Sequence, residues 1–181
     1  MIKDGDDLLM VILNAIDACN YTLVNGDILI LAQKIVSKAE SRLIPLKAVD
    51  PGQKAIDLAI QTDKDPRLVQ LILDESQEVM RSKPGVIIVR HNLGHVGANA
   101  GIDQSNIEQD EDGSALLLPK DPDGSAEKIK NRILKKLRVN VGVIIADSMN
   151  RPWRLGTVGE AIGCAGITVL DDRRGKNDLF G

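Results

Sequence analysis

Aromatic residues are nearly missing from this chain of 181 residues, which contains one Trp, one Tyr and one Phe. A core must therefore be built from aliphatic side chains, and the stacking platforms that bind single-stranded nucleic acid are lacking. Cysteine is equally scarce, since only Cys19 and Cys164 are present and they form no CxxC spacing. This argues against both a zinc knuckle and a disulfide framework.

Long apolar runs and an excess of positive charge are also absent. No apolar run approaches the roughly 20 residues needed to cross a bilayer, and the acidic start at Met1–Asp7 lacks the apolar stretch of a signal peptide. The 23 basic and 26 acidic residues give a formal net charge of -3, so no global positive field attracts a polyanion. Composition predicts a soluble, cytoplasmic protein with neither nucleic acid nor membrane as a partner.

Helical and strand-like patterns alternate along the chain, which predicts a mixed α/β (α+β) fold: a mixed sheet packed by helices, in one domain over residues 1–181. The helix starts are marked by acidic or proline-containing caps, and the apolar run of residues 28–31 is typical of a strand buried on both faces. The expected elements are helices opening at Asp6–Asp7, at Asp50–Gly52, at Asp65–Pro66 (with a helical pattern to Val79) and at Ser125, strands at 27–33, 86–89 and 141–146, and a long loop over 92–124.

The first segment with chemical potential is Ala98–Asn106, within that long loop. Small residues and a glycine let the backbone approach a ligand, while Asp103, Ser105 and Asn106 offer oxygen ligands and hydrogen bonds. Such a set suits a hard divalent cation that carries phosphate. The alternative is an Asx-rich turn with no ligand.

The second segment follows an apolar strand. Asp147 stands at the carboxyl end of that strand, where α/β sheets bind their ligands, and Ser148 adds a hydroxyl. Asp103 and Asp147 are expected to meet over one or two metal ions. The alternative is that Asp147 only caps a turn.

The third segment is basic and rich in glycine, as expected where phosphate or carboxylate is captured; the alternative is a solvated surface. Trp153, between Arg151 and Arg154, is expected to be a packing anchor rather than a substrate platform. Gln33, Ser37 and Lys38 follow the first strand and could touch a nucleotide, although the sequence has neither a Walker loop nor GxGxxG. The basic residues of this segment are Arg151, Arg154, Arg173, Arg174 and Lys176.

Taken together, these segments resemble the coenzyme F-420-0:L-glutamate ligases, in order and over nearly the whole chain. The combination of NAGIDQSN with DPDGSA is far more specific than any single glycine motif. The matching stretches are Gly26–Leu29, Ile35–Arg42, Asn99–Asn106, Leu117–Pro119, Asp121–Ala126, Asp147–Ser148, Arg151–Arg154 and Ala161–Gly163.

The resemblance implies a GTP-dependent acid–amino-acid ligase of the EC 6.3.2 class, with an α/β fold of its own type. Such an enzyme adds L-glutamate, first by an amide bond and then γ-linked, to the lactyl phosphate tail of the deazaflavin coenzyme F-420-0. The reaction class implies an acyl phosphate intermediate, which needs positioning and charge neutralisation more than a protein nucleophile. The family also implies a homodimer with Mg or Mn and K as cofactors.

Carried over by position, Asp103 and Asp147 match metal ligands, and Ser148 matches a second metal position where Thr is usual. Asn106 matches a nucleotide contact. The stretch that binds the nucleotide after the first strand corresponds to Ala32 and Gln33 with Ser37 or Lys38. The expected catalytic residues are Asp103, Asp147 and Arg151.

The resemblance also predicts an incomplete ligase domain, because family members begin further upstream, with a Gly-Leu-Pro-like piece, and continue past Gly181. On this expectation an N-terminal strand and a C-terminal part are missing. Two alternatives to the ligase stay open. One is a metal-dependent phosphohydrolase or phosphotransferase that uses the same acidic loops, and the other is an inactive, ligand-binding fragment.

Overall fold

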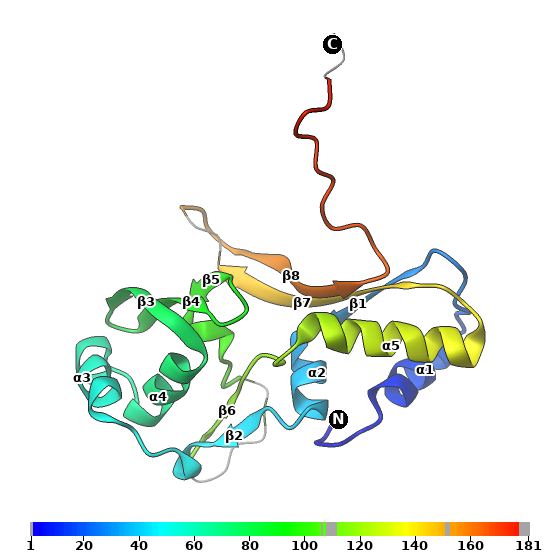
Figure 1. Ribbon diagram of the computed structural model, residues 1–181. Helices are drawn as coiled ribbons and strands as arrows, with labels where there is room; N and C mark the ends of the chain where they lie inside the picture. The colour runs from blue at the N-terminus through cyan, green and yellow to red at the C-terminus, as the bar shows by residue number, and fades with distance from the viewer. Residues whose placement is uncertain (1, 106, 108–111, 151–152, 178–181) are drawn as a thin grey trace.

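The computed structural model describes residues 2–105, 107, 112–150 and 153–177 (Figure 1). It is a mixed α+β fold, as predicted, with two groups of elements that each have their own core. We call them the first lobe, made of α1, α2, α5, β1, β7 and β8, and the second lobe, made of α3, α4, β3, β4 and β5. In the described residues no helix has both the length and the apolar content to cross a membrane.

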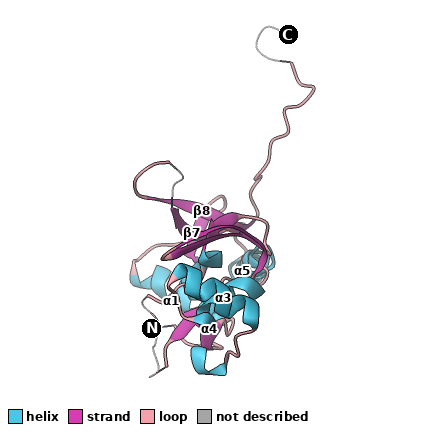
Figure 2. Ribbon diagram, turned by 90° about the vertical axis from the view of Figure 1, so that its left-hand side faces the viewer, coloured by secondary structure: helices cyan, strands magenta, loops and turns pink. Residues whose placement is uncertain are grey.

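The first lobe is a mixed three-stranded sheet in the order β1-β7-β8, packed by helices. Strand β1 runs parallel to β7, and β8 runs antiparallel to β7. The helices lie against one face of this sheet (Figures 1 and 2). Its elements are α1 (Leu8–Ala18), β1 (Ile28–Ala32), α2 (Gln33–Ala39), α5 (Pro122–Leu137), β7 (Gly142–Asn150) and β8 (Thr157–Ala165).

Strand β1 is buried on one face, not on both as predicted. Leu31 belongs to the first core, together with Val36, Ile133 and Ile145, whereas Ile28 is 53% and Ile30 68% exposed. The reason is that the helices of the first lobe cover only the face to which Leu31 points. The apolar run of β1 therefore does not indicate a sheet covered on both sides.

The second lobe is an antiparallel sheet in the order β3-β4-β5 with two helices on its inner face. Ile87 and Val89 of β4 are fully buried in this core with Val69 and Ile72 of α4. The elements are α3 (Gln53–Thr62), α4 (Pro66–Asp74), β3 (Ser76–Lys83), β4 (Val86–His91) and β5 (Val96–Ala98).

The predicted helix that continues to Val79 is wrong in its second half. Helix α4 begins after Asp65, as predicted, because the Asp65 carboxylate accepts the Arg67 N–H at 2.8 Å and Pro66 occupies the first turn. The helix ends at Asp74, and Val79 instead pairs with Val89 across the β3–β4 ladder. Tertiary pairing has overridden a helical spacing.

The segment 92–124 is not the structureless loop that its composition predicts. It contains β5, the short 3-10 helix η2 (Asn99–Gly101) and β6 (Ser114–Leu116). Strand β6 pairs antiparallel with β2 (Leu43–Pro45), which precedes the 3-10 helix η1 (Leu46–Ala48), and this two-stranded ribbon joins the lobes. The β2–β6 pairing is long-range, so no local pattern marks it.

Helix α5 begins at Pro122, one turn before the predicted cap at Ser125. The N-cap is Asp121, whose carboxylate accepts the Gly124 N–H at 2.9 Å. The Ser125 hydroxyl instead donates to the Glu40 carboxylate at 2.5 Å. An Asp-Pro pair is the stronger helix start, and it leaves Ser125 free to tie α5 to the end of α2.

Candidate functional site

The candidate site lies where β1 and β7 end side by side. These strands are parallel, and Ala32 at the end of β1 is level with Ala146 of β7. The chain then turns into α2, while β7 continues to Asp147 and Ser148 along its partner β8. Asp147 therefore occupies the predicted place, beyond the carboxyl end of a parallel pair, where α/β sheets bind ligands.

Asp103, in the segment between η2 and β6, lies near the same ends of β1 and β7. Its backbone is fixed by two hydrogen bonds with Leu116, at 3.0 and 2.8 Å. Lys34, in the first turn of α2, places Nζ 2.5 Å from Asp103 Oδ2 and 3.0 Å from Ser105 Oγ. Asp103 Oδ1 also accepts the Ser105 N–H at 2.6 Å, so the Asx turn considered for this segment is present as well.

Asp103, Asp147 and Glu160 share one electrostatic environment. Burial raises the pKa of Asp147 above its ordinary value, and the charges of Asp103 and Glu160 raise it further, against the Ser148 N–H and Lys34. Glu160 pairs with Asp147 in the β7–β8 register, so both side chains stand on one face. Burial alone would also raise the pKa of Asp103, but hydrogen bonds from Lys34 and Ser105 outweigh it and lower that pKa.

The donor set of this edge suits a divalent cation that is shared with a phosphate. Among the described residues, no three His, Cys, Asp or Glu side chains are grouped closely enough to enclose a metal ion. Magnesium is nevertheless commonly held by one or two carboxylates, with substrate phosphates and water completing its shell. Asp103 and Asp147, with the Ser148 hydroxyl, match that pattern, and the uncompensated charge at Asp147 is what a cation would neutralise.

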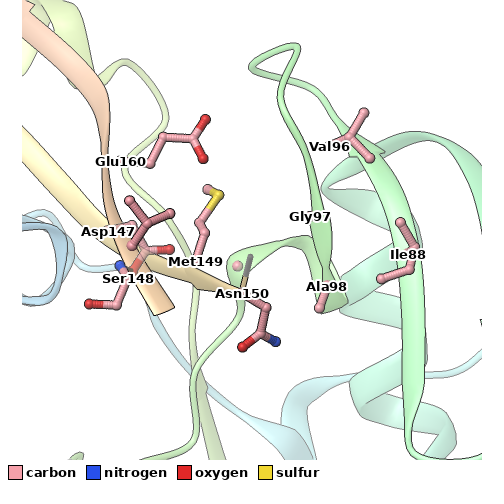
Figure 3. A pocket seen from close by; sticks show the side chains of 11 residues that line it. Ile88, Val96, Gly97, Ala98, Asp147, Ser148, Met149, Asn150 and Glu160 are labelled. Carbon is pink, nitrogen blue, oxygen red and sulfur yellow. Dashed lines mark hydrogen bonds between the residues drawn. The ribbon is translucent and has the colours of Figure 1, made fainter. Parts of the chain in front are cut away.

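A cavity of about 450 Å³ opens next to these carboxylates, between the two lobes (Figure 3). One wall is formed by β7 and β8 and carries Asp147 and Glu160. The opposite wall is formed by β4 and β5, with Ile88 and Ala98. Its size lies in the range of small-molecule sites.

The four predicted nucleotide contacts differ in how much they face solvent. Gln33 and Ser37 are buried, and the Ser37 hydroxyl donates to Gln33 Oε1 at 2.8 Å. Ala32 is exposed and Lys38 is half-buried. Nucleotide binding by this stretch therefore stays a prediction. In it, the buried Gln33 and Ser37 stabilise α2, and Ala32 and Lys38 are accessible at the surface.

Two predicted site residues, Asn106 and Arg151, lie outside the described residues. The structure does not bring the remaining basic residues to the site. Arg173 pairs with Asp171 at 2.6 Å and Arg174 with Asp172 at 2.7 Å, in a tail that runs away from the body of the molecule (Figure 1). These pairs are local and exposed, which favours the solvated alternative for this part of the cluster.

The packing role predicted for Trp153 is wrong, because its side chain is 100% exposed. Two residues of the site were missed by the sequence reasoning, Lys34 and Glu160. Lys34 lies between the singled-out Gln33 and Ser37, but nothing local marks one lysine among many as the partner of Asp103. Glu160 becomes visible only through the register that sets it opposite Asp147.

The similarity of this chain to known proteins extends over its whole length. The sequence model of the family described as F420-0:Gamma-glutamyl ligase matches residues 1–181. A coenzyme F420:L-glutamate ligase of Methanothermobacter thermautotrophicus is 44% identical over 181 residues, which is 100% of this chain and 71% of that protein. The enzymes of that name from Methanopyrus kandleri and Archaeoglobus fulgidus are 44% and 41% identical, and the match covers 99% and 100% of this chain and 68% and 69% of theirs.

Proposed function

Because the chain belongs to the F420-0:gamma-glutamyl ligase family, we propose that it is a ligase that joins L-glutamate to coenzyme F-420-0 at the expense of GTP. What supports the proposal is that Asp103 and Asp147, from segments far apart in the chain, are near enough for the charge of Asp103 to raise the pKa of Asp147, beside Lys34 and a cavity between the lobes. The family resemblance extends the proposal to a homodimer that uses Mg or Mn, and K.

The chemistry needs an activated acyl group, because a carboxylate is a poor acylating agent. In the proposed reaction, the γ-phosphoryl group of GTP moves to a carboxylate oxygen of the acceptor, which releases GDP and leaves an acyl phosphate. The amine of glutamate then attacks the carbonyl carbon, the amine loses a proton, and inorganic phosphate leaves with the electrons of the C–O bond. Positioning and charge neutralisation supply most of the rate enhancement in such phosphoryl transfers.

The three carboxylates and the lysine of the site can each be given a role in this reaction. Asp103, Asp147 and Ser148 would hold the divalent cation, which neutralises phosphate charge when bound. Lys34 holds its ammonium beside Asp103 and Ser105 and is placed to meet a phosphate oxygen. Glu160 is the cavity carboxylate left free by this arrangement, and we assign it the proton that the glutamate amine loses.

The first test is a thermal-shift titration with GTP, in the presence and absence of Mn. A ligand that binds only the folded state stabilises it, by about 2.7 kcal/mol at a concentration of 100 Kd. We expect a rise in Tm that depends on the metal and is lost in Asp103→Asn. Asp17→Asn, an exposed carboxylate of α1, is the matched control and should keep the full shift.

A ligation assay then decides the reaction. The product is followed as a mass increase of the acceptor by one glutamate residue, with phosphate release measured in parallel. Phosphate release that is indifferent to glutamate and to the acceptor would identify a phosphohydrolase instead. A folded sample whose Tm responds to neither GTP nor Mn would contradict the assignment of a nucleotide site to this chain.

A further inference from the structure

The sheet of the second lobe has an outer face that the helices leave open. In the β3–β4 register, Arg81 stands opposite Ile88 and Lys83 opposite Val86. Side chains alternate between the faces of a strand. Since Ile87 is fully buried on the inner face, the two cations and the two apolar residues all stand on the outer face.

This outer face lines a second cavity of about 600 Å³. Its floor is Val86 and Ile88, and its walls include Arg81, Lys83 and Trp153. Ile88 also lines the cavity that holds Asp147 (Figure 3), so the two hollows adjoin across this one side chain. A single extended ligand can therefore run from the carboxylates of the candidate site to Trp153.

The chemistry of the second cavity is complementary to an anion joined to a flat aromatic ring. Within the described part of the chain, neither Arg81 nor Lys83 has a hydrogen-bonding or ion-pair partner, so both cations are available to an anion. Trp153 is fully exposed, and an exposed indole beside an apolar floor is a stacking surface.

We propose that this outer face binds the acceptor: Arg81 and Lys83 hold its phosphate, and its deazaflavin ring lies against Trp153 and Val86. The proposal rests on the proposed function, which requires the reacting carboxylate of the acceptor to lie beside Asp147. The rest of the acceptor must then leave the acidic cavity, and the path past Ile88 leads to unpaired cations and an indole. Recognition of the acceptor is thus separate from the metal and nucleotide contacts.

The binding test uses the only tryptophan of the chain as its probe. Coenzyme F-420-0 is titrated into the full chain without nucleotide or metal, with N-acetyltryptophanamide to correct for light absorbed by the ligand. We expect saturable quenching of Trp153 fluorescence. In Arg81→Ala/Lys83→Ala the Kd should rise by at least about tenfold, as for the loss of charge-assisted hydrogen bonds.

The matched control is Lys54→Ala/Lys135→Ala, which removes two exposed cations of α3 and α5 and should leave the Kd unchanged. All of the substituted residues are exposed, so the variants are expected to fold, and circular dichroism checks this. Trp153→Phe removes the signal, and its Kd is measured by equilibrium dialysis. The absence of quenching in the unsubstituted chain, or an unchanged Kd in the Arg81/Lys83 variant, overturns the proposal.

Steady-state ligation separates this proposal from the proposed function. The Arg81/Lys83 variant should raise KM for the acceptor by about tenfold, with KM for GTP and for glutamate unchanged. Ligation by the variant with the KM of the unsubstituted chain overturns the acceptor subsite and leaves the ligase assignment standing. Binding that depends on Arg81 and Lys83, without ligation in any variant, overturns the ligase assignment and leaves the subsite standing.

Discussion

Arg42 is the buried charge at the junction of the two lobes. Its guanidinium donates from Nε to the Leu118 carbonyl oxygen at 2.7 Å and lies 2.8 Å from Glu75 Oε2. His91 Nε2 lies 3.6 Å from the same carboxylate oxygen. Burial alone would raise the pKa of Glu75, but His91 and Arg42 outweigh it and hold that pKa below its ordinary value of 4.5.

Glu75→Gln should lower the free energy of unfolding at pH 7 by about 3 kcal/mol, because the Arg42 cation stays buried without its counter-charge. A carboxyl group whose pKa is lowered by folding adds stability above its unfolded pKa and loses it as the pH falls through the folded value. The difference between the two proteins should therefore shrink below about pH 4.5. Urea unfolding followed from pH 7 to pH 3 measures both effects.

Glu78→Gln is the control for Glu75→Gln. It breaks an exposed ion pair between Glu78 of β3 and Arg90 of β4. Its cost should stay below about 1 kcal/mol at every pH. An equal cost for both variants would show that the burial of the Arg42–Glu75 pair has no energetic consequence.

At the scale of elements, local signals predicted the starts of α1, α3 and α4, but they did not predict α2 or the start of α5 at Pro122. Asp7 and Asp65 cap α1 and α4 as expected, because a cap depends only on neighbouring residues. Strands β5 and β6 were missed because they are only three residues long, and β3 was missed because it is largely polar. Strand β6 also pairs with β2, which lies far along the chain. Residues that pair in space leave no periodic trace in such short segments.

Packing of α5 on β8 gives a prediction at this scale. A Cβ atom on Gly163 would lie 2.4 Å from the Pro122 carbonyl carbon and 2.7 Å from its oxygen. Backbone cannot give way as a side chain can, so Gly163→Ala should cost about 1–3 kcal/mol or more. Gly159→Ala is the control, since that position on the same strand has nothing within 4 Å, and thermal unfolding compares the two. Equal Tm values would contradict the close approach.

At the scale of the whole molecule, the second lobe is formed by a segment in the middle of the chain, and the first lobe is formed by the segments before and after it. One core contains Ile145 and the other Ile72, both fully buried. The candidate cavity has a wall from each lobe, so the site exists only when the lobes are held together. Sequence reasoning found Asp103 and Asp147 as acidic groups with strand and loop signals. It could not find Glu160, which depends on the β7–β8 register, or the exposure of Trp153, which depends on tertiary packing.

Ile72→Ala and Ile145→Ala should each lower the free energy of unfolding by about 3 kcal/mol. We expect each variant to keep a single unfolding transition, because the β2–β6 ribbon and the Arg42–Glu75 pair couple the lobes. Differential scanning calorimetry checks this, with Ile60→Ala as the exposed control at under about 0.5 kcal/mol. Two resolved peaks in either core variant would show that the lobes unfold independently.

The open face of β1 has a practical consequence for handling the protein. Strand β1 forms one edge of its sheet and presents Ile28 and Ile30 to solvent, and edges of this kind recruit other strands. A net charge of -3 gives little colloidal repulsion between molecules. Sulfate and phosphate buffers strengthen apolar association, so the chain is best concentrated in weakly salting-out chloride buffers, above its isoelectric point of about 5.4.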